Sequence, residues 1–153
     1  MDIFKTTVLA AESGDGFKYP SLWNPSINFS FVALQDLAAA AAIVLEERER
    51  HYFAVYPLCS TMPMSYDAVC KLASEVLGKR IMAEQLPFEK AVETFLKNMF
   101  GNTQEIDPRR RDAAERMLLY YNRHGLSGNP NVLEWLIKRK ATTFEELMTK
   151  KKS

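Results

Sequence analysis

The stretch 27–47, "INFSFVALQDLAAAAAIVLEE", decides which class of fold this chain can adopt. It begins with alternating apolar and polar side chains and then becomes fully apolar, which predicts a buried strand over 27–34. An alanine run follows, and alanine has the highest helix propensity of all residues. Asp36 stands where the N-cap of that helix is expected, so the pattern predicts a helix from about 37 to 48.

The segments on either side of this stretch predict only a few more strands. Upstream, 4–11 predicts a short strand, 12–16 a turn, and 17–26, which carries two prolines, an extended loop. Downstream, the aromatic and β-branched run 51–58 predicts a strand, and 79–86 predicts another short one. So few strands cannot build a complete doubly wound sheet.

Helix signals dominate the second half of the chain. Further helices are predicted from capping residues and apolar periodicity at 65–78, 87–101, 107–125, 131–140 and 142–147. Ser65 is the expected N-cap of the first of these, and the last carries a Thr-x-x-Glu capping box. The sequence therefore predicts an α+β fold, a truncated α/β arrangement in which a small sheet of a few strands accompanies about five to six helices.

Length and composition narrow the class of protein. The 153 residues suit one domain over 1–153, and we expect 1–13 and 148–153 to be flexible ends. The net charge of +1 gives no general attraction to nucleic acid or to an anionic membrane. The longest apolar run, 37–45, is about half of what a membrane span needs. We therefore expect a cytoplasmic protein with neither kind of partner.

Motifs for cofactors and metals are missing from the sequence. Two cysteines and two histidines provide no metal-ligand spacing. Gly14-Asp15-Gly16 lacks the third glycine of a dinucleotide fingerprint, and Pro20 prevents a helix from following it. The chain also has no Gly-x-Ser-x-Gly elbow and no Tyr-x-x-x-Lys pair. The sequence predicts no cofactor and no metal site.

Two residues are candidates for acid–base chemistry, and each has a simpler structural interpretation. Asp36 follows a predicted strand, where functional sites gather, but helix capping explains it more simply. His124 titrates near neutral pH, but a cation at a helix C-terminus also favours the helix dipole. The structural interpretation is preferred for both.

Three separated blocks of the chain resemble one family. They are "FSFVALQDLAAAAAIVLEE" (29–47), "RHYFAVYPLCSTMPMSYDAVCKLASEVLGKRI" (50–81) and "YYNRHGLSGNPNVLEWLIKRKATTFEEL" (120–147). In this order they resemble the C-terminal half of NmrA-like proteins, which are atypical short-chain dehydrogenase relatives, and the likeness is to their fungal branch. The resemblance implies that the chain lacks the Rossmann half, which in this family holds the glycine fingerprint and the nucleotide.

The resemblance also implies where a substrate pocket lies. In NmrA-like proteins the C-terminal lobe closes over the substrate cleft. One wall is then expected from Tyr120, Tyr121 and His124, and the other from the loop with Tyr19, Trp23 and Asn24. Trp135 is assigned to the core. Asp36 and His124, joined by Asp15, are the implied acid–base groups.

Three functions are compatible with this interpretation. The first is a cofactor-independent enzyme, a cyclase, isomerase or lactonising enzyme acting on a polyketide-like metabolite. The second is a non-enzymatic regulatory or binding module, and the third is a truncated NAD(P)-dependent oxidoreductase subunit. A ligand cavity with buried carboxylates favours the enzyme, whereas an exposed apolar patch without such a cavity favours the module. In each case we expect a homodimer, because removing half of a sheet exposes apolar surface.

Overall fold

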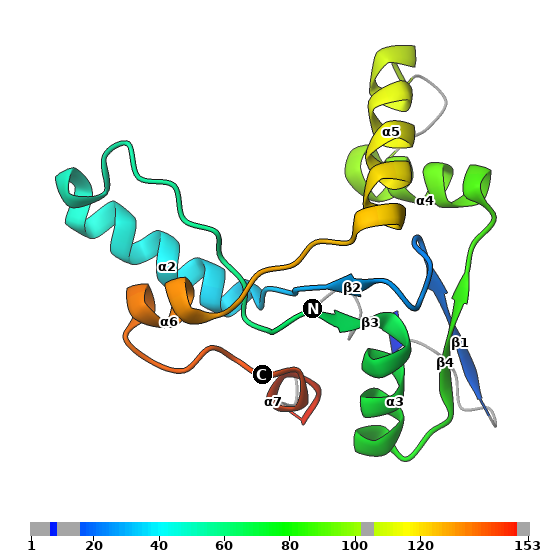
Figure 1. Ribbon diagram of the computed structural model, residues 1–153, viewed down its shortest axis with the longest axis horizontal. Helices are drawn as coiled ribbons and strands as arrows, with labels where there is room; N and C mark the ends of the chain where they lie inside the picture. The colour runs from blue at the N-terminus through cyan, green and yellow to red at the C-terminus, as the bar shows by residue number, and fades with distance from the viewer. Residues whose placement is uncertain (1–6, 9–15, 102–105, 150–153) are drawn as a thin grey trace.

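The computed structural model describes residues 7–8, 16–101 and 106–149, and it has the mixed α+β architecture that the sequence predicts (Figure 1). Six α-helices accompany two small sheets within this part of the chain. In chain order the elements are β1 Phe17–Ser21, β2 Asn28–Phe29, α2 Leu34–Glu47, the 3-10 helix η1 Arg48–His51, β3 Met64–Ser65, α3 Tyr66–Leu77, β4 Ile81–Gln85, α4 Phe88–Phe100, α5 Pro108–His124, α6 Asn131–Ile137 and α7 Phe144–Thr149.

The two sheets have two strands each. β1 runs parallel to β4 with Phe17 opposite Ile81, and β2 runs antiparallel to β3. The loop predicted over 17–26 is therefore wrong for its first residues, which form β1. Pro20 is tolerated there because the backbone of its neighbours, not its own, faces β4 in this register.

Side-chain caps begin three of the described helices, and the caps predicted at α3, α5 and α7 are confirmed. The Ser65 hydroxyl accepts a hydrogen bond from the Ala68 N–H at 3.1 Å, and α3 ends at Gly78 with a left-handed φ of 64°. At α7 the capping box is complete, because Thr143 and Glu146 each accept a bond from the other's backbone N–H.

Several strand and cap predictions differ from the structure. In 27–34 only Asn28–Phe29 is a strand, and α2 begins earlier than predicted, at Leu34. Asp36 lies inside the first turn and is not the N-cap, which is Ala33. Residues 51–58 form the end of η1 and an extended segment, because no described strand lies beside them to pair with. Of the strand predicted at 4–11, only residues 7–8 are described, and they are helical.

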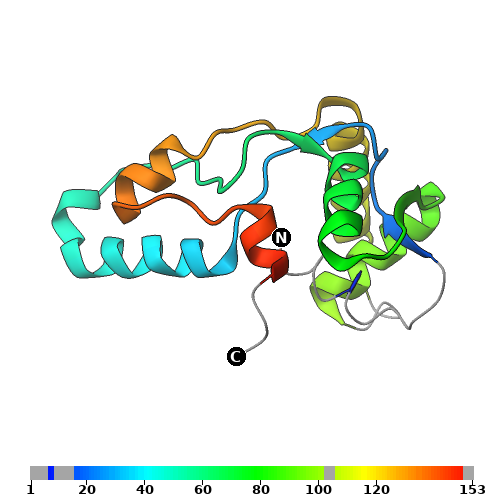
Figure 2. The same cartoon turned by 90° about the horizontal axis from the view of Figure 1, so that it is seen from below.

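The elements form two regions, which we call the compact half and the arm. The compact half contains β1, β4, α3, α4, α5 and α7, with one core around Val69 and Phe144 and another around Leu96 and Leu118. The arm contains α2, η1, the extended segment 52–59 and α6, and it has its own thin core around Leu133. Figures 1 and 2 both show the arm projecting away from the compact half. None of the described helices is both long and apolar enough to cross a membrane.

Candidate functional site

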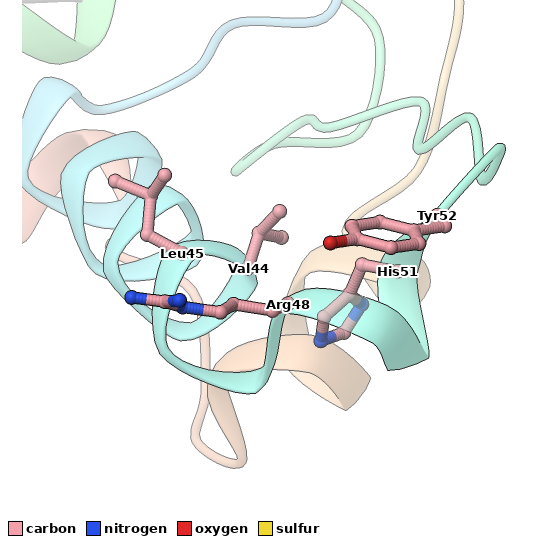
Figure 3. A pocket seen from close by; sticks show the side chains of 5 residues that line it. All are labelled: Val44, Leu45, Arg48, His51 and Tyr52. Carbon is pink, nitrogen blue, oxygen red and sulfur yellow. The ribbon is translucent and has the colours of Figure 1, made fainter.

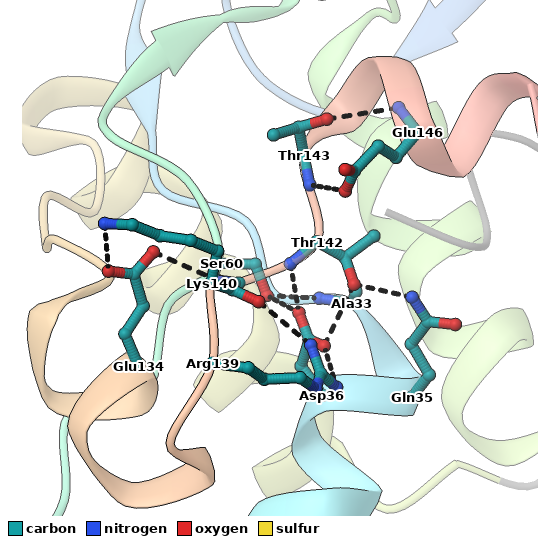
Figure 4. A network of polar contacts seen from close by, with 11 residues as sticks. Ala33, Gln35, Asp36, Ser60, Glu134, Arg139, Lys140, Thr142, Thr143 and Glu146 are labelled. Atoms are coloured by element: carbon teal, nitrogen blue, oxygen red, sulfur yellow. Dashed lines mark hydrogen bonds and ion pairs between the residues drawn. The ribbon is translucent and has the colours of Figure 1, made fainter.

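Asp36 is the centre of a buried polar network between the arm and the segment that leads to α7 (Figure 4). Its Oδ1 accepts hydrogen bonds from Arg139 Nη2 at 2.8 Å and from the Thr142 hydroxyl at 2.9 Å. Its Oδ2 accepts from the Thr142 N–H at 2.7 Å and from the Ser60 hydroxyl at 2.9 Å. Four donors from three residues therefore converge on one carboxylate.

This network makes Asp36 a structural carboxylate. Its side chain is 0% exposed, and both of its oxygens are occupied by protein donors. Burial raises the pKa of a carboxyl group, but the hydrogen bonds from Thr142, Arg139 and Ser60 outweigh burial and hold the pKa of Asp36 below its usual value. An ionised, fully bonded and enclosed carboxylate ties α2 to residues 139–142 and has no free lone pair facing solvent.

His124 lies at the C-terminal end of α5, in the compact half, and Asp36 lies in the arm, so the structure does not join them in one site. The His124 Nδ1–H donates to the Tyr120 carbonyl oxygen at 2.9 Å, and the two rings stack at 4.4 Å. Both side chains are exposed. Tyr121 instead packs against the core around α3. This is the helix C-terminal position that the sequence predicts for His124.

The second pocket wall was predicted from the loop with Tyr19, Trp23 and Asn24, but most of these side chains pack inside the compact half. Tyr19 stacks on Tyr66 with 5.7 Å between ring centroids, and burial raises the pKa of Tyr19 to about 12. Trp23 lies 5.1 Å from Phe29 within the same aromatic cluster. Asn24 donates its backbone N–H to Asn122 Oδ1 on α5 at 2.6 Å.

Asn24 and Asn122 thus bring the two predicted walls into contact. Tyr19 and Trp23 fill the space between secondary-structure elements, and neither side chain is exposed. The third implied acid–base residue, Asp15, lies outside the described residues.

A hollow that the sequence did not predict lies in the arm, around His51. His51 Nδ1 lies 2.8 Å from the Tyr56 hydroxyl oxygen, and Nε2 lies 3.3 Å from Glu47 Oε2. With a neutral imidazole, Nε2–H donates to the carboxylate and Nδ1 accepts from the phenol. Trp135 forms one wall of this hollow, which measures about 370 Å³, and is 66% exposed. The assignment of Trp135 to the core is therefore wrong.

A second hollow lies against another side of His51 (Figure 3). It measures about 440 Å³ and is lined by Val44, Leu45, Arg48, His51 and Tyr52. Both hollows are open to solvent. Beside them the extended segment exposes large apolar side chains. The only sequence signal for this surface was the strand-like composition of 51–58, which has no partner strand among the described residues.

Comparisons with known proteins show which solved structures share this architecture. Neither the family models nor the curated proteins that were compared match the chain. Solved structures do. The NADPH-dependent quinone oxidoreductase of Escherichia coli matches with a TM-score of 0.67 and 20% identity over 97% of this chain and 50% of its own. The triphenylmethane reductase of Citrobacter sp., complexed with NADP(H), matches with a TM-score of 0.60 and 24% identity over 86% of this chain and 43% of its own.

A third match is NmrA, a negative transcriptional regulator in complex with NAD, with a TM-score of 0.55 and 15% identity over 86% of this chain and 41% of its own. The chain has the fold of part of these proteins. It spans about half the length of the solved structures it matches. At these identities the likeness concerns the fold alone, and these three neighbours are NmrA and two enzymes described with NADPH or NADP(H).

Proposed function

We propose that this chain is a non-enzymatic binding module with the fold of the substrate-side, C-terminal lobe of an NmrA-like protein, and that it works through a protein contact made by the arm. The observation that carries this proposal is the exposed apolar surface of residues 45–55 beside two open hollows. Exposed apolar patches of this kind mark interaction sites on proteins.

The state of the acid–base candidates supports the same function. A general base needs a free lone pair within reach of the substrate. The Asp36 oxygens are instead occupied by Arg139, Thr142 and Ser60. His124 lies in a different region and faces solvent. A cyclase, isomerase or lactonising activity on a polyketide-like metabolite stays a prediction, tested by the Asp36→Asn and His124→Ala variants.

The structural neighbours support a binding role as well. One of them is a transcriptional regulator, so this fold serves at least one protein described as a regulator and not as an enzyme. The neighbours described with NADP(H) are about twice as long as this chain, and its sequence has no glycine-rich phosphate loop. An NAD(P)-dependent oxidoreductase subunit would therefore need a nucleotide-binding half from elsewhere.

A fluorescence titration with NADPH tests the proposal. The chain has two tryptophans, Trp23 in the compact half and Trp135 beside the arm hollow, so binding in either region changes emission. We expect no saturable quenching up to about 1 mM NADPH. A Kd of about 1 mM corresponds to only about 4 kcal/mol of binding free energy. The quinone oxidoreductase of Escherichia coli is the positive control. Saturable binding by this chain would contradict the proposal and favour the redox alternative.

A further inference from the structure

An apolar patch covers the tip of the arm. We define it by Leu45, Tyr52, Phe53 and Val55, whose side chains are 74%, 64%, 104% and 90% exposed. Large apolar side chains scattered singly over a surface are ordinary, but these four fall within eleven residues of the chain, and Leu45 and Tyr52 line the same hollow. A surface of this kind gains free energy when another apolar surface covers it.

The backbone under this patch is strained and incompletely bonded. Phe53 has a left-handed φ of 61°, a conformation that is unfavourable for a bulky side chain. The N–H groups of Phe53 and Val55 have no hydrogen-bond partner among the described residues, whereas those of Tyr52 and Ala54 donate to carbonyls of η1. In an extended strand, residues two apart present their N–H groups to the same edge. An extended backbone at Phe53 would relieve this strain and would point the N–H groups of Phe53 and Val55 to the same edge.

The rim of the patch carries one positive and one negative side chain, so the rims of two copies can pair opposite charges. Arg48 and Glu49 are both exposed, and neither has an ion-pair partner within the part of the chain that the structure describes. In a dimer with two-fold symmetry, an ion pair between Arg48 of one copy and Glu49 of the partner subunit would form twice. The net charge of +1 means that two copies do not repel each other at long range.

We infer that the apolar patch docks on the same patch of a second copy of this chain, with residues 52–56 of the two copies paired as antiparallel strands and Arg48 of each copy bound to Glu49 of the partner subunit. This inference rests on the proposed binding function, because it names the partner of the arm. In the paired strands, Phe53 of each copy lies opposite Val55 of the partner subunit.

Light scattering on a size-exclusion column, with protein at 1 to 200 µM, tests the dimer. We expect a mass of twice 17.5 kDa, with a Kd of about 10 µM or tighter. The Phe53→Asp variant should raise that Kd at least about 30-fold. Leu119→Asp is the matched control, because Leu119 is 56% exposed on α5 in the compact half. A monomer at 200 µM, or equal effects of the two variants, would overturn the inference.

Charge reversal tests the geometry of the contact. Arg48→Glu alone and Glu49→Arg alone each place like charges together and should each weaken the dimer about tenfold. An equal mixture of the two variants should form a mixed dimer of wild-type strength, because opposite charges meet again at both positions. Both residues are exposed, so neither change disturbs folding, and circular dichroism verifies this. Failure of the mixture to recover would overturn the proposed pairing.

The NADPH titration separates this inference from the proposed function. A monomer that binds no NADPH would overturn the dimer and leave the binding function standing. A dimer that binds NADPH saturably would confirm the contact and contradict the binding function.

Discussion

The compact half and the arm are held together by different means. In the compact half, Val69, Val92, Leu96 and Leu118 are buried in two apolar cores, and the caps of α3 and α5 bond their own helices. In the arm, a thin core around Leu133 is supplemented by the Asp36 network, and the segment after η1 is unpaired. The difference shows that the compact half is held mainly by apolar cores and local caps, whereas the arm depends on a polar network that ties it to residues 139–142.

The largest expected loss of stability comes from truncating one buried leucine in each region. The two losses test directly whether the compact half has the better packed core. Leu96 is 2% exposed in the compact half, and Leu133 is 0% exposed in the arm. We expect Leu96→Ala to lower the free energy of unfolding by about 3 to 4 kcal/mol, and Leu133→Ala by about 2 kcal/mol because the thin arm core collapses around the smaller side chain. Urea unfolding measures both, and a larger loss for Leu133→Ala would contradict the comparison.

Removing the Asp36 carboxylate should cause the next largest loss of stability, and that loss should fall on the arm. Asp36→Ala leaves the Thr142 N–H, the Thr142 hydroxyl and the Ser60 hydroxyl without their acceptor, so we expect a loss of about 3 kcal/mol in the free energy of unfolding. Asp36→Asn keeps an acceptor oxygen and should lose less. Chemical denaturation followed by Trp135 fluorescence reports on the arm directly. Unchanged stability in the alanine variant would show that the network is not structural.

A cap in the compact half provides a smaller, local effect. Ser65→Ala removes the acceptor for the Ala68 N–H at the start of α3 and should cost about 1 kcal/mol. Ser65→Asp keeps an acceptor and serves as the matched control. Thermal unfolding of both variants measures the effect, and equal melting temperatures for Ser65→Ala and wild type would count against the cap.

Acid should weaken the arm through Asp36, with no effect at neutral pH. The folded-state pKa of Asp36 is lowered, so its contribution to stability is fully present above the unfolded pKa of about 3.9 and is lost as pH falls through the folded pKa. The difference in stability between wild type and Asp36→Asn should therefore shrink as pH falls below about 4. Thermal unfolding from pH 7 to pH 2.5 measures this, and a constant difference would contradict the assignment.

The sequence predicts well what is decided within a few residues. Ser65, Gly78 and the Thr143–Glu146 box act on their own helices, so their roles can be recognised from spacing. The partners of Asp36 lie much farther along the chain, at Ser60, Arg139 and Thr142, and no local sequence pattern predicts them. The segment 51–58 has strand composition, but a strand needs a neighbour, and composition does not say whether the chain supplies one.

Hydrogen exchange of the whole chain, measured by mass spectrometry at several protein concentrations, tests the central claim most directly. The claim is that the arm carries an unpaired segment that acts by contact. It predicts that the amides of Phe53 and Val55 exchange freely at low protein concentration and become protected at high concentration, while those of α3 are protected throughout. If the amides of Phe53 and Val55 were protected as strongly as those of α3 at the lowest concentration, the claim would be contradicted, because the segment would then be paired within the chain.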